Sequence, residues 1–251
     1  MTIALVVGAV ATLLGGIAQR ATGTGFALIA TPILVLVLGP LDSVLVVNMC
    51  AAISATLVTA QVWRSVEWRR YLPLAIAGLA LVPLGVLTAS SLDAGWLQCL
   101  VGATVLLAIV SPLVFRRLAV SSDSRIVGWA AGGAAGFLNA IAGLGGPALT
   151  AYALLSRWEY TAFRATIQPV FATMGIGSLL GKLLLSAGTY RLPDPGLFLT
   201  LAVCTMLGIT IGTVVVRWMP ERIGRILVIV IASAGATTIL IQGGIDIASR
   251  G

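Results

Sequence analysis

The chain has 251 residues, of which 59% are hydrophobic and 9% are charged, and its mean hydropathy is +1.09. A soluble domain carries about 25% charged residues, so the composition excludes a soluble globular protein and predicts one integral membrane domain over residues 1–251. The formal charge of +7 comes from Lys and Arg residues that stand one to three at a time between apolar runs. This distribution is typical of membrane topology signals and not of a nucleic-acid surface.

Several chemistries lack the residues that they need. The sequence contains no histidine, which removes the commonest metal ligand and the usual general base. Cys50, Cys99 and Cys204 lie inside apolar runs at unrelated spacings, so neither a disulfide framework nor a metal site is predicted. No GxSxG or GxxxxGK[ST] pattern occurs. We therefore predict no enzyme activity, no cofactor and no metal site.

In chain order, the first apolar segment is divided into two short runs by the sequence QRATGTG, and three runs long enough to cross a bilayer follow. The short runs cover residues 3–18 and 26–38, and the long runs cover 41–63, 71–90 and 96–115. We expect the first run to belong to the mature protein, because no small-residue cleavage site follows it.

The second half of the chain has the same order of runs. Short runs on either side of NAIAGLGG cover residues 126–138 and 147–155, and long runs cover 160–187, 195–218 and 223–242. Irregular backbone is tolerated at membrane depth only where protein or water surrounds it. Each pair of short runs is therefore predicted to form a hairpin that dips toward the midplane.

The two halves align with each other at an offset of 120 residues. The matched pairs include Gly16 with Gly136, Gln19 with Asn139, Gly23 with Gly143, Gly25 with Gly145, and Asn48 with Gln168. After seven extra residues near 186–195, the offset becomes 127 and pairs Gly85 with Gly212. These matches predict internal repeats at about residues 1–118 and 124–246, joined near 116–125.

The loop charges predict how the repeats are oriented. RSVEWRR, at residues 64–70, follows the first long run of its repeat, whereas RWMPERIGR, at 217–225, follows the second long run of the other repeat. Because basic loops face the cytoplasm, the two repeats are predicted to be inverted in the membrane. The basic joint at 116–125 is then cytoplasmic, both termini lie outside, and the protein is expected in the plasma membrane, which is the inner membrane of a prokaryote.

Two glycine-rich segments, GGIAQRATGTGFALIATPIL and GFLNAIAGLGGPALTAYALL, resemble the paired motifs of the sulfite exporter TauE/SafE family, also called the 4-toluene sulfonate uptake permease family. The resemblance covers essentially the whole chain. It implies transport of small sulfur-containing or organic anions such as sulfite, sulfonates or sulfoacetate.

Inverted repeats with interrupted helices are also the architecture of secondary transporters, whose substrate lies where the repeats meet. We therefore predict an all-α polytopic membrane protein of two inverted repeats, each with a broken helix hairpin followed by three long transmembrane helices. The predicted function is a secondary transporter, either an exporter or a facilitator, of such anions. An anion-selective channel of the same build is the alternative.

Substrate-binding residues are expected at the two helix breaks and on the first long helix of each repeat. Helix N-termini at the hairpin tips would attract an anion, and Arg20 could bind a sulfonate or sulfite through two parallel hydrogen bonds. Thr24 is expected to cap the helix that starts near Phe26, or to offer its hydroxyl to the anion. The candidate residues are Gln19, Arg20, Thr22, Gly23, Thr24, Gly25, Asn48, Asn139, Gly143, Gly145, Gly146 and Gln168.

Structural roles are open for the same residues. The glycines would also let helices pack closely, Arg20 would reach an aqueous surface if the first run is a complete span, and Asn48 and Gln168 would form interhelical hydrogen bonds. Arg164 and Lys182 lie within a few turns of the ends of the run 160–187, so snorkelling to the surface is the better explanation for both.

All eight acidic residues are expected in or beside connections, so no carboxylate is placed to couple transport to protons or sodium. A facilitator, or export coupled through protonation of the substrate itself, fits better. The expected partners are a small anionic substrate and the lipid bilayer, without nucleic acid. A homo-oligomer is left open.

Overall fold

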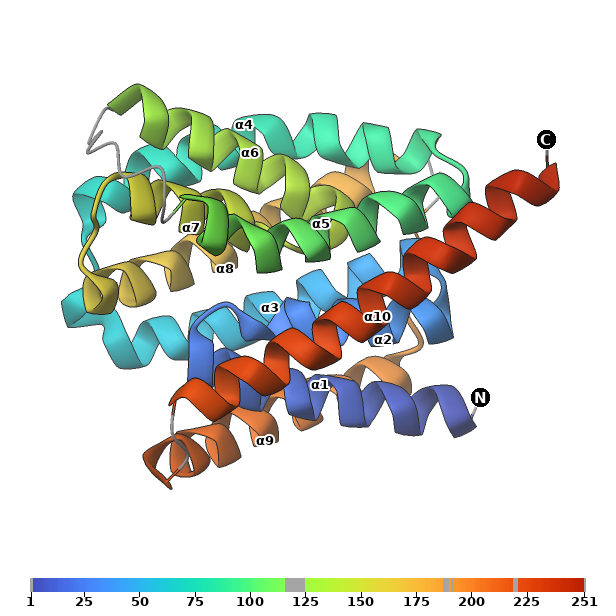
Figure 1. The fold of residues 1–251 in the computed structure, drawn as a ribbon, viewed down its shortest axis with the longest axis horizontal. Coiled ribbons are helices and arrows are strands. Elements are labelled where there is room, and N and C mark those ends of the chain that lie inside the picture. The colour runs from blue at the N-terminus through green and yellow to red at the C-terminus, as the bar shows by residue number, and fades with distance from the viewer. Residues whose placement is uncertain (1, 116–124, 187–189, 191, 219–220, 251) are drawn as a thin grey trace.

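The computed structural model describes residues 2–115, 125–186, 190, 192–218 and 221–250, and every regular element among them is helical. The elements of the first half are α1 (Thr2–Thr22), α2 (Gly25–Leu38), α3 (Pro40–Val62), the 3-10 turn η1 (Trp63–Ser65), α4 (Trp68–Ser91) and α5 (Ala94–Phe115). Those of the second half are α6 (Arg125–Ala142), α7 (Gly146–Leu155), α8 (Tyr160–Leu185), α9 (Pro195–Trp218) and α10 (Glu221–Arg250). The helices lie side by side in one bundle (Figure 1).

Seven of the described helices are long and apolar enough to cross a membrane, namely α1, α3, α4, α5, α8, α9 and α10, while α2 and α7 are shorter apolar helices. Large apolar side chains cover the outside of the bundle: Leu84 is 54% exposed, Leu199 64% and Val230 59%. In water such a surface would aggregate, whereas lipid chains cover it without cost. The prediction of an all-α polytopic membrane protein is confirmed.

The helix breaks are shorter than the sequence predicts. The run expected at 3–18 is part of α1, which continues to Thr22 and is itself one of the seven candidate spans. In the same way α6 continues to Ala142, so only residues 143–145 separate it from α7. Gly23 and Gly143 determine where the helices end, because their φ angles of +82° and +71° lie in the left-handed region that favours glycine.

The last helix is also longer than predicted. The run expected at 223–242 is α10, which extends to Arg250. Asp246 therefore lies within the last turns of a helix and not beyond its end. Another acidic residue, Asp123, lies outside the described residues.

The same helix crossing is formed twice. α4 packs along α6, and α1 packs along α9. A Cβ built on Gly85 of α4 would lie 2.7 Å from the Phe137 carbonyl oxygen of α6, and one built on Gly212 of α9 would lie 2.9 Å from the Ile17 Cα of α1. Gly85 matches Gly212, and Ile17 matches Phe137, in the alignment of the two repeats. Glycine is needed at both crossings because no side chain fits between the backbones.

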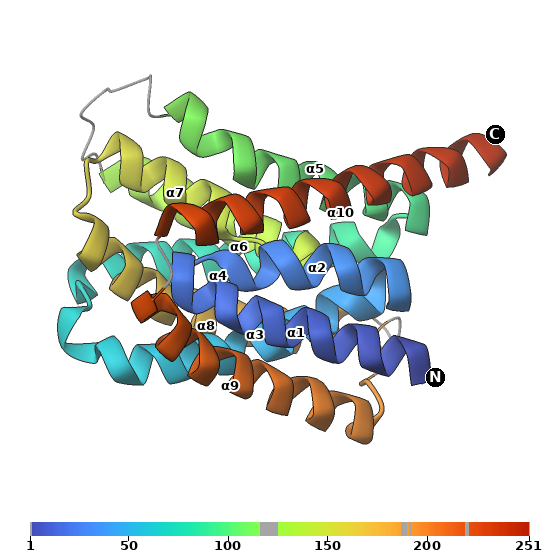
Figure 2. The same ribbon diagram turned by 60° about the horizontal axis from the view of Figure 1, so that its bottom comes forward.

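The two halves run in opposite directions. In Figures 1 and 2, α1 begins on the right and α6 on the left, and α5 and α10 pack against each other with opposite directions. An inverted repeat would produce this arrangement. The joint at 116–124 and residues 219–220 of the second basic loop lie outside the described residues, and the orientation in the membrane stays a prediction.

The corner between α7 and α8 is packed with aromatic rings. Trp158 is buried there, with its ring 5.9 Å from that of Tyr152 and 5.6 Å from that of Phe163, measured between centroids. The Arg70 guanidinium lies 4.8 Å from the centroid of the Trp158 ring, within cation–π distance. The corner thus joins the start of α8 to the end of α7 and to α4.

Glu159 completes this corner by capping α8. Its carboxylate accepts hydrogen bonds from the backbone N–H groups of Thr161 (2.9 Å) and Ala162 (2.7 Å), which lower the pKa of Glu159. The corresponding corner between α2 and α3 is different: it consists of Gly39, with a φ of +80°, and a Cβ there would meet nothing within 4 Å.

We expect cysteines introduced at Ser65 and Arg217 to react with a membrane-impermeant thiol reagent from one side of the membrane, and a cysteine at Ser91 to react from the other. All three positions are exposed, and the basic loops place the first two in the cytoplasm. The measurement is labelling of right-side-out and inside-out vesicles, in a chain whose three native cysteines are replaced by alanine. Labelling of Ser65→Cys and Arg217→Cys from opposite sides would contradict the inverted repeat.

Candidate functional site

Two cavities adjoin the helix breaks and share Gln19 in their walls. The larger one, here termed the arginine cavity, has a volume of about 180 Å³, and its walls include Gln19, Arg20, Gly23, Val62, Arg164 and Gln168. The smaller one, the glycine pocket, has a volume of about 30 Å³, and its walls include Gln19, Thr24, Asn139, Gly143, Gly145 and Gly146.

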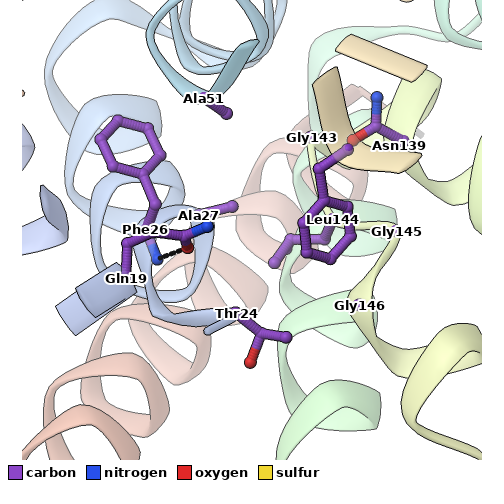
Figure 3. Close-up of a pocket in the computed structure, with 11 residues that line it drawn as sticks. Gln19, Thr24, Phe26, Ala27, Ala51, Asn139, Gly143, Leu144, Gly145 and Gly146 are labelled. Carbon is purple, nitrogen blue, oxygen red and sulfur yellow. Dashed lines mark hydrogen bonds between the residues drawn. The ribbon is translucent and has the colours of Figure 1, made fainter. Parts of the chain in front are cut away.

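The glycine pocket lies between the two breaks. Figure 3 shows Gln19, Phe26 and Ala27 on one side and Leu144 and Gly145 on the other. Thr24 comes close to the second break, because a Cβ built on Gly146 would lie 3.7 Å from the Thr24 Cβ. A volume of about 30 Å³ holds about one water molecule. The structure thus brings the two breaks together around a space that is too small for an oxyanion.

Two amide side chains satisfy the backbone at the first break. The Gln19 Oε1 accepts from the Phe26 N–H (3.1 Å), and the Gln19 Nε2 donates to the Gln168 Oε1 (3.0 Å). The Gln168 Nε2 donates in turn to the Gly23 carbonyl oxygen (3.1 Å). Buried backbone groups need such partners, and here Gln168 supplies one from the other repeat.

Of the two roles predicted for Thr24, capping of α2 is wrong, and donation of its hydroxyl to an anion stays a prediction. Thr24 is the residue before the helix, but its side chain makes no capping hydrogen bond, and Gln19 takes that role. The Thr22 hydroxyl donates to the Ala18 carbonyl oxygen (3.0 Å), and a Cβ built on Gly25 would lie 2.7 Å from the same oxygen. Thr22 and Gly25 belong to neither set of cavity walls, and their contacts are with α1.

The second break is held in a related way. The Asn48 Nδ2 donates to the Asn139 carbonyl oxygen (3.4 Å), which also accepts from the Gly143 N–H (2.9 Å). The Asn139 Nδ2 donates to the Ser178 Oγ (3.1 Å). Each break therefore accepts a hydrogen bond from an amide in the other half of the chain, Gln168 of α8 at the first and Asn48 of α3 at the second. Asn48 and Gln168 do form interhelical hydrogen bonds, which is one of the two roles open to them.

The arginine cavity contains two guanidinium groups in its walls. The Arg20 Nε donates to the Thr213 Oγ1 of α9 (3.1 Å), and the Arg164 Nη2 donates to the Arg20 carbonyl oxygen (2.9 Å). No carboxylate of a described residue forms a salt bridge with either arginine. Since a guanidinium is always protonated, the cavity carries positive charge without a counter-ion.

A family model described as sulfite exporter TauE/SafE matches the chain over residues 7–238. The chain belongs to this family. Comparison with the curated proteins and with solved structures gave no match. The TauE/SafE chain is therefore a multi-pass membrane protein and a transporter of the sulfite-exporter type, not an enzyme.

The sequence predicts that Arg164 and Lys182 both snorkel to the surface. Arg164 is half-buried and lies in the wall of the arginine cavity beside the exposed residues Ser65 and Thr161, which does not contradict the prediction. Its position one helical turn before Gln168 is the available signal, because residues four apart on a helix share a face. Lys182 was also expected at the surface, but it is only 1% exposed, so the snorkelling prediction is wrong for Lys182.

We expect Gly143→Ala to lower the free energy of unfolding more than Gly39→Ala does. Both positions have positive φ, which costs an L-residue about 1–2 kcal/mol. Only at Gly143 would the new methyl also meet a neighbour, the Val47 Cγ1 at 2.8 Å. The measurement is thermal unfolding of the purified protein in detergent.

Gly244→Ala is the matched control, because this helical glycine has open space and no positive φ. It should leave the stability unchanged or raise it slightly. Equal losses for Gly39→Ala and Gly143→Ala would contradict the close packing of the second break on α3.

Proposed function

We propose that this chain is a secondary transporter of small sulfur-containing or organic anions, such as sulfite, sulfonates or sulfoacetate, and that they bind in the arginine cavity. The observation that carries the proposal is the pair Arg20 and Arg164, which line one cavity without a carboxylate partner among the described residues. A guanidinium forms two parallel hydrogen bonds with a sulfonate or carboxylate group. Membership of the TauE/SafE family supports the same class of substrate.

The size of the cavity favours a small substrate. Its volume of about 180 Å³ lies below the roughly 300–1,000 Å³ of sites for drug-sized ligands. The wall also offers uncharged hydrogen-bonding groups, since Ser65 and Thr161 lie beside the arginines. A compact oxyanion with several acceptor oxygens suits this set of donors.

The position of the cavity supports export as the direction of transport. Ser65 lies in the wall of the cavity and within the basic segment 64–70, which the positive-inside rule places in the cytoplasm. An anion from the cytoplasm would therefore reach Arg20 and Arg164 first, which supports export. No Asp or Glu is among the described residues of either cavity wall. This favours a facilitator, or coupling through protonation of the substrate, over a carboxylate relay.

Replacing Arg20 or Arg164 with Ala should weaken sulfite binding roughly ten- to a hundredfold, because hydrogen bonds to charged groups contribute about 1.5–3 kcal/mol and each 1.4 kcal/mol is a factor of ten. Arg20→Lys should restore part of the affinity, since it keeps the charge and loses the planar fork. The measurement is calorimetric titration of the purified protein with sulfite.

Arg217→Ala is the control, because Arg217 is exposed at the end of α9 and lies in neither cavity wall. It should bind sulfite as the wild type does. Wild-type affinity in both Arg20→Ala and Arg164→Ala, with unchanged thermal unfolding, would show that the arginine cavity is not the binding site.

The narrow glycine pocket favours a carrier over a channel. Because the space between the breaks holds about one water molecule, an anion crosses only when the breaks move apart. Sulfite flux into liposomes should therefore saturate at low substrate concentration and accelerate when sulfite is present on the opposite side. Flux that rises linearly with sulfite concentration would support the channel instead.

A further inference from the structure

Lys182 of α8 is a buried basic residue without a hydrogen-bond or salt-bridge partner in the part of the chain that the structure describes. Its side chain is 1% exposed. Its Nζ lies within cation–π distance of the Tyr190 ring, 5.5 Å from the centroid. Burial of an amino group without a hydrogen-bond acceptor is costly, and ionisable residues inside membrane segments are functional candidates by default.

The repeat alignment relates Lys182 to the arginine cavity. The offset of 120 pairs Lys182 with Val62 and Ser178 with Val58. Val58 and Val62 both line the arginine cavity. Lys182 therefore occupies, in the second repeat, the position of a cavity-wall residue in the first.

This counterpart lies toward the opposite end of the bundle. α8 begins beside the arginine cavity, where Tyr160 and Arg164 are in the wall, and it runs to the other end (Figure 1). Lys182 is three residues from the end of α8 at Leu185, so it lies on the far side of the breaks from Arg164.

A hydrogen bond connects this part of α8 to the second break. Ser178, one turn before Lys182 and on the same helix face, accepts from the Asn139 Nδ2 (3.1 Å). Asn139 also lines the glycine pocket. Lys182 itself lines neither cavity and is buried beside Tyr190. The arginine side of the breaks thus has a cavity, whereas Lys182 is covered.

We propose that Lys182 forms a second anion-binding site of the transport path, which binds the oxyanion on the far side of the breaks from Arg20 and Arg164. This inference rests on the proposed function. Alternating access opens the two sides of the site in turn, and the described arrangement is the state with the arginine side open. When the other side opens, the sulfite or sulfonate oxygens supply the hydrogen-bond acceptors that the Lys182 ammonium lacks.

The two repeats are complementary in this respect. Arg20 matches Ala140, and Lys182 matches Val62. Each half thus contributes a cation at a position where the other half has an apolar residue. The path has positive charge on both sides of the breaks, although the sequence positions that provide it are not equivalent.

Lys182→Met removes the amino group and keeps most of the stem, so the bundle should stay folded. For sulfite entering liposomes from the face where α8 ends, the half-saturating concentration should rise roughly tenfold or more, corresponding to the loss of one charged hydrogen bond. Entry from the arginine face should keep its wild-type half-saturating concentration. Lys182→Arg should restore the wild-type half-saturating concentration for entry from the face where α8 ends. Identical half-saturation of wild type and Lys182→Met at the far face would overturn the inference.

Accessibility provides a second readout that does not depend on transport. In a chain without native cysteines, Lys182→Cys should react with a small sulfonate-bearing methanethiosulfonate added at the face where α8 ends. Leu180→Cys is the control, because Leu180 is 51% exposed on a candidate span and lies in neither cavity wall, so we expect it to face lipid and not to react. Sulfite transport by the wild type together with an unreactive Lys182→Cys would overturn this inference alone, whereas absence of sulfite transport by the wild type would overturn the proposed function.

Discussion

A helix that is interrupted inside a membrane leaves backbone N–H and C=O groups that lipid cannot satisfy. In this TauE/SafE chain, side-chain amides supply missing partners: Gln19 accepts from the Phe26 N–H within the first half, and one further amide reaches each break from the opposite half of the chain. Gln168 donates to the Gly23 carbonyl of the first break, and Asn48 donates to the Asn139 carbonyl of the second. α8 therefore completes the first half and α3 completes the second. The Gly23 carbonyl oxygen depends on the second half for this hydrogen bond, whereas the Asn139 carbonyl oxygen also accepts from the Gly143 N–H of its own half.

The amides at the first break are partly committed to the protein itself. Gln168 uses both Nε2 protons on the Gly23 and Arg164 carbonyl oxygens, whereas Gln19 donates one proton to Gln168 and keeps the other. The guanidinium groups of Arg20 and Arg164 have no acidic partner and face open space. The chemistry of the two kinds of side chain explains this difference. An amide satisfies a neutral carbonyl or N–H group, whereas a guanidinium matches the charge and planar shape of an oxyanion.

Composition and periodicity are sufficient to predict the helical membrane fold, and the glycine pattern is sufficient to locate both breaks, because Gly23 and Gly143 adopt a backbone conformation that few other residues accept. The length of α1 is not predictable from hydropathy. Gln19 and Arg20 lower the mean hydropathy at the end of the first run. Both are nevertheless helical, because α8 and α9 supply partners for their side chains. Such partners depend on tertiary packing, which a single sequence does not reveal.

The burial of charged side chains could not be predicted for the same reason. The distance of Lys182 from the end of its helix suggests a surface position, but neighbouring elements cover that end of α8. The cap of α2 is a related case. Thr24 has the expected residue type, whereas Gln19, seven residues before Phe26, reaches the helix start because the chain reverses at Gly23.

The two corners after α2 and α7 have a mechanical consequence. Around Trp158, any rotation of α7 against α8 would separate ring contacts with Tyr152 and Phe163, so this corner resists bending. At Gly39 the surroundings are open and the residue has no side chain, so its torsion angles can change without collision. A movement that separates the two breaks would therefore bend the chain more easily at Gly39 than at Trp158, and α7 and α8 would turn together. The two halves of the chain thus differ in stiffness at corresponding corners.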